Sequence, residues 1–139
     1  MEAKELMIGD LVCYTSKPDG LNEKRESAIV LGTNFRSDVI LLWGDGWETW
    51  KHESTIEPIP ITPEILEKNG FVKSAIEEGV YNFPDNNKAL KERGFSLGYH
   101  GCGRWFITDH NLMMILYVHQ LQQALRLCRL SELADNFQI

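Results

Sequence analysis

The stretch TWKHESTIEPIPITPEI, residues 49–65, is the most informative part of this chain. Its first part predicts the last strands of a β-rich unit, and Pro58 and Pro60 then interrupt regular structure. Thr62 offers a helix N-cap, and Pro63 suits the first helical position because the N–H that it lacks has no helical partner there. The stretch therefore divides the chain into a β part, residues 1–61, and a mixed part, residues 62–139.

The β part contains five short segments that favour strands, separated by turn signals. The first follows the Gly9-Asp10 turn and ends at Tyr14, and the others lie at residues 28–35, 39–43, 47–50 and 55–59. The polar residues 15–27 predict a loop, Gly32 predicts a bulge, and residues 44–46 (Gly-Asp-Gly) predict a tight hairpin. Five strands in about sixty residues favour a small closed barrel. The pattern resembles that of small Tudor-type (Src-homology-3-type) barrels.

The mixed part opens with the short helix that Thr62 begins and Asn69-Gly70 ends. Short strands are predicted at residues 71–76, 80–83, 95–99 and 104–108. Periodicity alone leaves residues 112–116 open between strand and early helix, and we favour a strand. A helix is predicted from about Tyr117 to Arg129, and the tail from Ser131 to Ile139 is expected to add an edge strand or to stay loose.

The helix predicted near the C-terminus carries an apolar stripe of Val118, Leu121, Leu125 and Cys128. The stripe suits packing within one chain and a homodimer equally well. The fold class predicted for the whole chain is α+β. We expect an N-terminal small β-barrel packed on a C-terminal part that runs helix, antiparallel sheet, helix.

Composition narrows the classes of function. The 139 residues include 14 Lys and Arg against 20 Asp and Glu, a net charge of −6, which disfavours nucleic-acid binding. The longest apolar run, residues 112–118, is far shorter than a membrane span, and the charged N-terminus has no signal-peptide pattern. Three widely spaced cysteines form no disulfide framework. These features predict a cytoplasmic protein without a membrane partner.

Three segments carry a resemblance to a known family. They are LMIGD at residues 6–10, PIPITPEILEKNGF at residues 58–71 and YVHQLQQALRLC at residues 117–128. Together, in this order, they are similar to a family of small uncharacterised proteins of Bacteroides-type bacterial genomes, often within phage or prophage regions. The resemblance spans nearly the whole chain and implies a phage-associated accessory protein. It implies no catalytic residues, because the family has no established activity.

Motifs for catalysis are incomplete. A zinc-protease helix needs H-E-x-x-H, but Gln120 and Gln123 follow His119 where the base and the second ligand should stand. Cys102 lies between His100 and His110 in a Gly-rich segment, which could form a Cys–His pair or a partial metal site. The favoured interpretation is a Gly-rich turn in which these residues are incidental. No phosphate-binding glycine loop is present. We therefore assign no catalytic residue, metal or cofactor.

Aromatic residues gather around the predicted hairpin. Trp43, Trp47 and Trp50 lie on or beside it, with Tyr14 and Phe35 expected nearby. In Tudor-type barrels such side chains can form a cage for a methylated cation, with an acidic neighbour that here would be Asp45 or Glu48. The simpler interpretation is that a small barrel fills its interior with aromatic rings.

The sequence thus favours a non-enzymatic interaction module of phage or prophage origin that binds an unidentified protein through the aromatic hairpin. One alternative is nucleic-acid binding by the barrel through a basic surface that would include Lys17, Lys24, Arg25 and Arg36. Another is an unrecognised hydrolase that uses Cys102 and a histidine.

Overall fold

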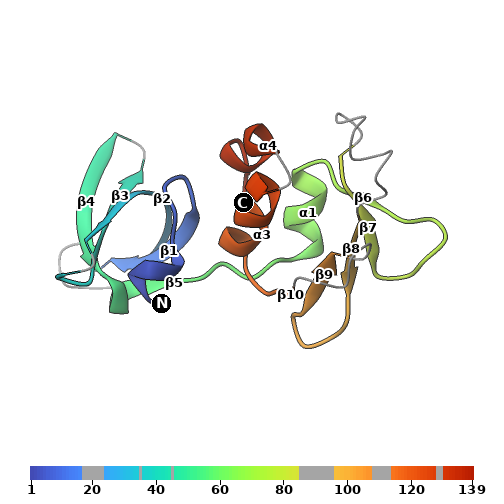
Figure 1. The fold of residues 1–139 in the computed structure, drawn as a ribbon, viewed down its shortest axis with the longest axis horizontal. Helices are drawn as coiled ribbons and strands as arrows, with labels where there is room; N and C mark the ends of the chain where they lie inside the picture. The colour runs from blue at the N-terminus through green and yellow to red at the C-terminus, as the bar shows by residue number, and fades with distance from the viewer. Residues whose placement is uncertain (17–23, 35, 45, 85–95, 108–113, 128–129) are drawn as a thin grey trace. The chain divides into compact units, whose positions relative to one another are not determined.

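The computed structural model describes residues 1–16, 24–34, 36–44, 46–84, 96–107, 114–127 and 130–139 (Figure 1). These residues form two antiparallel five-stranded sheets and three α-helices, which confirms the predicted α+β class. The chain comprises two compact units. Unit 1 is Met1–Ile59 with Tyr117–Asp135, and unit 2 is Pro60–Leu116 with Asn136–Ile139. The predicted division into residues 1–61 and 62–139 stays a prediction.

Unit 1 contains the five strands expected in the first sixty residues. They are β1 (Leu11–Ser16), β2 (Lys24–Asn34), β3 (Val39–Gly44), β4 (Trp47–His52) and β5 (Ile56–Glu57), in the sheet order β4-β3-β2-β1-β5. Short 3₁₀ turns, η1 (Ala3–Glu5) and η3 (Glu53–Thr55), precede β1 and β5. The predicted bulge at Gly32 is confirmed by a register shift between Val30 and Gly32. The predicted polar loop is shorter than expected, because β1 extends to Ser16 and β2 begins at Lys24.

The core of the unit 1 sheet follows the two-residue alternation of its strands. Val12, Val30, Ile40 and Leu42 are fully buried, while their neighbours along the strands face the other way. Within the described residues the predicted closure of the barrel is wrong, since β4 and β5 are the outer strands of an open sheet. The reason is that β5 has only two residues, and both pair with β1.

Two helices of unit 1 come from the end of the chain, α3 (Val118–Leu127) and α4 (Ser131–Asp135). The predicted helix is confirmed over α3, and Val118, Leu121 and Leu125 of its stripe are buried, while Cys128 lies outside the described residues. The expectation of a strand or loose segment is wrong for residues 131–135. They form a helix because Leu130 and Ala134, one turn apart, are both buried.

Unit 2 begins with α1 (Pro63–Lys68), where the predicted cap is confirmed: Thr62 Oγ1 accepts a hydrogen bond from the Ile65 N–H at 3.3 Å. Past Asn69-Gly70 the Phe71 N–H donates to the Leu66 carbonyl at 3.0 Å, which ends the helix. The antiparallel strands follow in the order β10-β9-β8-β7-β6. They are β6 (Val72–Lys73), β7 (Val80–Asn82), β8 (Ser96–Tyr99), β9 (Trp105–Ile107) and β10 (Met114–Ile115), so the favoured strand at residues 112–116 is confirmed in its described part.

Candidate functional site on the outer face of β3 and β4

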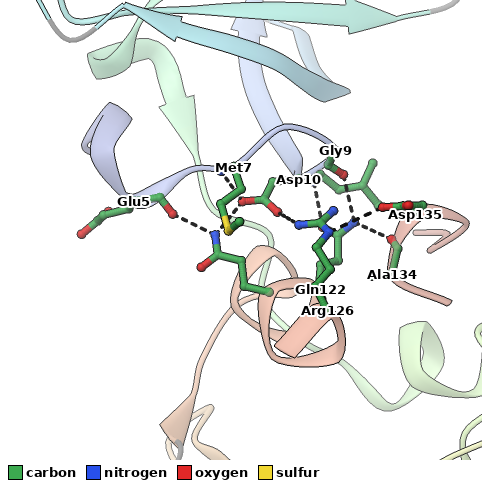
Figure 2. A network of polar contacts seen from close by, with 10 residues as sticks. Glu5, Met7, Gly9, Asp10, Gln122, Arg126, Ala134 and Asp135 are labelled. Atoms are coloured by element: carbon green, nitrogen blue, oxygen red, sulfur yellow. Dashed lines mark hydrogen bonds and ion pairs between the residues drawn. The ribbon is translucent and has the colours of Figure 1, made fainter. Parts of the chain in front are cut away.

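The site lies on a sheet that a buried polar network holds to helix α3. Figure 2 shows Asp10 and Arg126 pointing toward one another, and Arg126 Nη1 donates to Asp10 Oδ1 at 2.6 Å. The second oxygen, Oδ2, accepts from the Met7 N–H at 2.8 Å and from Gln123 Nε2 at 2.7 Å. Asp10 is fully buried, so these charge-assisted bonds compensate for the water that its carboxylate has lost.

Gln122 of α3 completes this network. Its Oε1 accepts from the Leu11 N–H at 2.8 Å, and its Nε2 donates to the carbonyls of Gly9 at 3.1 Å and Ala134 at 2.9 Å. One buried amide therefore joins the start of β1 to α3 and α4 (Figure 2). A Cβ on Gly9, whose φ is +94°, would lie 2.8 Å from Arg126 Nη2, so glycine is needed both for the turn and for this approach.

The register of β3 and β4 decides where the tryptophans point. Trp43 pairs with Glu48, and Leu41 pairs with Trp50, so these four side chains share one face. Ile40 and Leu42, which alternate with them, are fully buried on the other face. The outward face of β3 and β4 therefore carries two exposed indoles, Trp43 at 40% and Trp50 at 53%.

Apolar residues extend this surface. Ile29 of β2 pairs with Trp43, and Val39 of β3 lies two residues before Leu41, so both share the face and are half-buried. We name the set Ile29, Val39, Leu41, Trp43 and Trp50 the outer Trp face. The exposed side chains of Glu48 and His52 lie on the same side of β4. The face is thus apolar, with polar groups along one strand.

Trp47 and Tyr14 lie on the inner side of the sheet. Their rings meet edge to face at 5.4 Å, and Lys51 Nζ lies 5.7 Å from the centre of the Tyr14 ring. The Tyr14 hydroxyl donates to Glu26, and burial together with this bond raises the pKa of Tyr14 to about 12. Gly44 leaves room for the Trp47 indole, which a Cβ at that position would overlap.

Five of the six residues expected to bind a partner therefore fall into two groups. Trp43, Trp50 and Glu48 are on the outer side, and Trp47 and Tyr14 are on the inner side, so the four rings do not surround one shared space. Asp45 and Phe35 lie outside the described residues. The sequence indicates this separation of the two tryptophans, because Trp47 and Trp50 are three positions apart and therefore face opposite sides of one strand.

The residues considered for metal or catalysis are placed as follows. His119 is buried, its ring stacks on Tyr117 at 5.9 Å, and burial lowers its pKa. Gln123 is bonded to Asp10 and to the Glu5 carbonyl. No group of three or more His, Cys, Asp or Glu in the described residues is suited to hold a metal ion.

The proposed Cys–His pair is described only in part. Cys102 is an exposed free thiol in the turn between β8 and β9, with φ of +52°. The His100 ring packs edge-on against Phe106 at 4.6 Å. His110 lies outside the described residues. Of the basic residues considered for nucleic acid, Arg25 is paired with Glu57, and Lys17 lies outside the described residues.

Comparison of the chain with protein-family models, with curated proteins and with solved structures found no match. Within the described ranges, no helix is both long and apolar enough to cross a membrane. Sequence reasoning missed the Asp10–Gln122–Arg126 network. The only local signal is a polar pair on one side of the apolar helical stripe, Gln122 and Arg126 at a four-residue spacing.

Proposed function

We propose that this protein is a non-enzymatic interaction module of phage or prophage origin that binds a protein partner through the outer Trp face. The observation that carries the proposal is the pair of exposed indoles, Trp43 and Trp50, on adjacent strands of one sheet face. Exposed apolar patches with tryptophan are characteristic of protein-binding surfaces, where tryptophan is enriched among the residues that dominate affinity. The phage or prophage origin is supported by the resemblance of residues 6–10, 58–71 and 117–128.

The edge of the sheet favours an extended segment of the partner. In the described part of the chain, β4 pairs with β3 alone, so its other edge offers backbone N–H and C=O groups. An added strand would use these groups for hydrogen bonds and would place alternate side chains beside Trp50. The proposed occupant is therefore a β-strand of another protein that carries apolar residues at every second position.

Charge favours protein over nucleic acid as the occupant. The exposed polar neighbours of the outer Trp face on β4 are Glu48, which is acidic, and His52, and neither is Lys or Arg. A surface that binds phosphates gains most of its affinity from Lys and Arg, which the face lacks. An apolar segment of a protein partner needs no such charge.

Photocrosslinking tests the proposal. The chain would carry p-benzoylphenylalanine in place of Trp50, and a matched control would carry it in place of Ile76, which is 94% exposed in unit 2. Both would be irradiated in a bacterial lysate with and without nuclease. Crosslinks to one protein from position 50 alone, unchanged by nuclease and reproduced with that protein purified, would support the proposal.

Two results would overturn it. Equal crosslinking from positions 50 and 76 would show that the capture is unspecific, and nuclease-sensitive crosslinks would favour the nucleic-acid alternative. A variant with serine in place of both Trp43 and Trp50 provides a further control, because it removes the two exposed indoles of the outer Trp face. Because both side chains are exposed, the variant should fold, which its far-UV circular dichroism would verify.

A further inference from the structure

A cavity of about 400 Å³ lies within unit 2, independent of the outer Trp face. It is bounded by Ile61, Thr62 and Pro63, which lie just before and at the start of α1, and by one face of the unit 2 sheet. Ligand sites in proteins commonly have volumes of about 300 to 1,000 Å³, so the cavity is large enough for a small molecule.

The sheet side of the cavity is aromatic. Tyr99 pairs with Trp105, and Tyr81 pairs with Leu97, two residues before Tyr99, so all three rings are on the same face. The Trp105 ring lies 5.8 Å from Tyr81 and 5.0 Å from Tyr99. Tyr81 and Trp105 are buried, whereas Tyr99 is 48% exposed. The first two rings therefore form a fixed floor, and Tyr99 presents a free ring surface.

Hydrogen bonds at the hydroxyl and at the backbone hold Tyr99 in place. Its hydroxyl accepts a hydrogen bond from the Gly103 N–H at 3.3 Å, and the Tyr99 N–H donates to the Gly79 carbonyl at 2.8 Å. Gly79 and Gly103 also line the cavity. A ring that is exposed but fixed at both ends loses little conformational freedom when another ring stacks on it.

The cavity also carries one charge of each sign. Lys73, at the end of β6, and Glu78, just before β7, line it from the two sides of the same hairpin. Both side chains are exposed, and no ion pair joins either of them to a described residue. An ammonium and a carboxylate beside an aromatic floor are complementary to a ligand that has a ring, an anionic group and a cationic group.

We propose that this cavity binds a small aromatic zwitterion, the chemical class of the aromatic amino acids. The ligand ring stacks on Tyr99 between the aromatic floor and the Ile61–Pro63 wall. The ligand carboxylate pairs with Lys73, and the ligand ammonium pairs with Glu78. Charge at two points and a ring between them would distinguish such a ligand from apolar molecules of the same size.

Titration calorimetry with L-tryptophan, tryptamine and indole-3-propionate tests each part of the proposal. Tryptamine lacks the carboxylate, and indole-3-propionate lacks the ammonium. Each should bind about twofold to fivefold more weakly than L-tryptophan, the effect of one exposed ion pair. Equal binding of all three ligands, or no heat with L-tryptophan at millimolar concentration, would overturn the proposal.

Two substitutions assign the charges. Lys73→Met should weaken L-tryptophan and indole-3-propionate but leave tryptamine unchanged, and Glu78→Gln should weaken L-tryptophan and tryptamine but leave indole-3-propionate unchanged. Glu77→Gln, an exposed neighbour that does not line the cavity, is the matched control and should change nothing. If Lys73→Met and Glu78→Gln affect all ligands alike, or neither affects any, the assignment of the two charged groups is wrong.

Discussion

Replacement of Gln122 by methionine should destabilise unit 1 more than any surface substitution on α3. Methionine has nearly the same length and volume as glutamine, so the packing of the buried side chain is kept and only its hydrogen bonds are lost. Three backbone groups would lose their partner: the Leu11 N–H and the carbonyls of Gly9 and Ala134. Because the side chain is only 1% exposed, water cannot replace the missing bonds without opening the structure.

The size of the effect follows from these three groups. A buried donor or acceptor left without a partner costs about 1 to 3 kcal/mol. Partial relaxation of α4 would lower the cost at Ala134, so the expected loss of unfolding free energy is about 3 to 5 kcal/mol. Small proteins have about 5 to 15 kcal/mol in total, so the variant should lose a large part of its unfolding free energy.

Urea denaturation followed by far-UV circular dichroism measures this loss. The matched control is Leu127→Met, one turn and a half further along α3, where the side chain is 76% exposed and a change below about 0.5 kcal/mol is expected. If Gln122→Met and Leu127→Met differ by less than about 1 kcal/mol with equal denaturant slopes, the amide does not join β1 to the helices as described.

Three further changes test the packing around the sheet. Gly44→Ala should lower the unfolding free energy by about 1 to 3 kcal/mol and alter near-UV circular dichroism, because the new methyl group displaces the Trp47 ring from Tyr14; an unchanged spectrum would contradict the overlap. The pKa of Tyr14 is raised from its ordinary 10 to about 12, so the contribution of Tyr14 to the unfolding free energy is fully present below pH 10 and is lost as the pH rises toward 12. Tyr14→Phe should remove this loss in alkaline urea titrations. Burial lowers the pKa of His119 from its ordinary 6.5, so the contribution of His119 to the unfolding free energy is fully present above pH 6.5 and is lost as the pH falls through the folded-state pKa. His119→Gln should therefore make the unfolding free energy less dependent on pH in acid. An unaltered acid profile would show that this histidine does not titrate there.

Local signals in the sequence predicted the local structure well. Thr62, Pro63 and Asn69-Gly70 define both ends of α1 because capping depends on residues within one turn of the helix. The bulge at Gly32 was predicted for the same reason, since glycine weakens a strand interior locally. The three-residue spacing of Trp47 and Trp50 also places them on opposite faces of β4, a local signal that the interpretation of all four rings as one cage overlooked.

Long-range structure was not predictable from the same signals. Asp10 and Arg126 are separated by 116 positions, and nothing near either residue names the other as its partner. The start of β2 at Lys24 was missed because residues 24–27 are polar, yet their pairing with β1 supplies the backbone bonds that make them a strand. Helix α4 was missed because five residues are too few to show a helical period, and its burial depends on contacts with α3.

The affinity of the crosslinked partner for purified variants is the decisive test of binding through the outer Trp face. The dissociation constant would be measured for the wild-type chain, for Trp50→Ser and for Ile76→Ser, both exposed positions whose substitution leaves the core unchanged. We expect a dissociation constant at least about tenfold higher for Trp50→Ser, since interface tryptophans commonly contribute more than about 1.4 kcal/mol, and no change for Ile76→Ser. Equal dissociation constants for Trp50→Ser and the wild type would contradict binding through the outer Trp face.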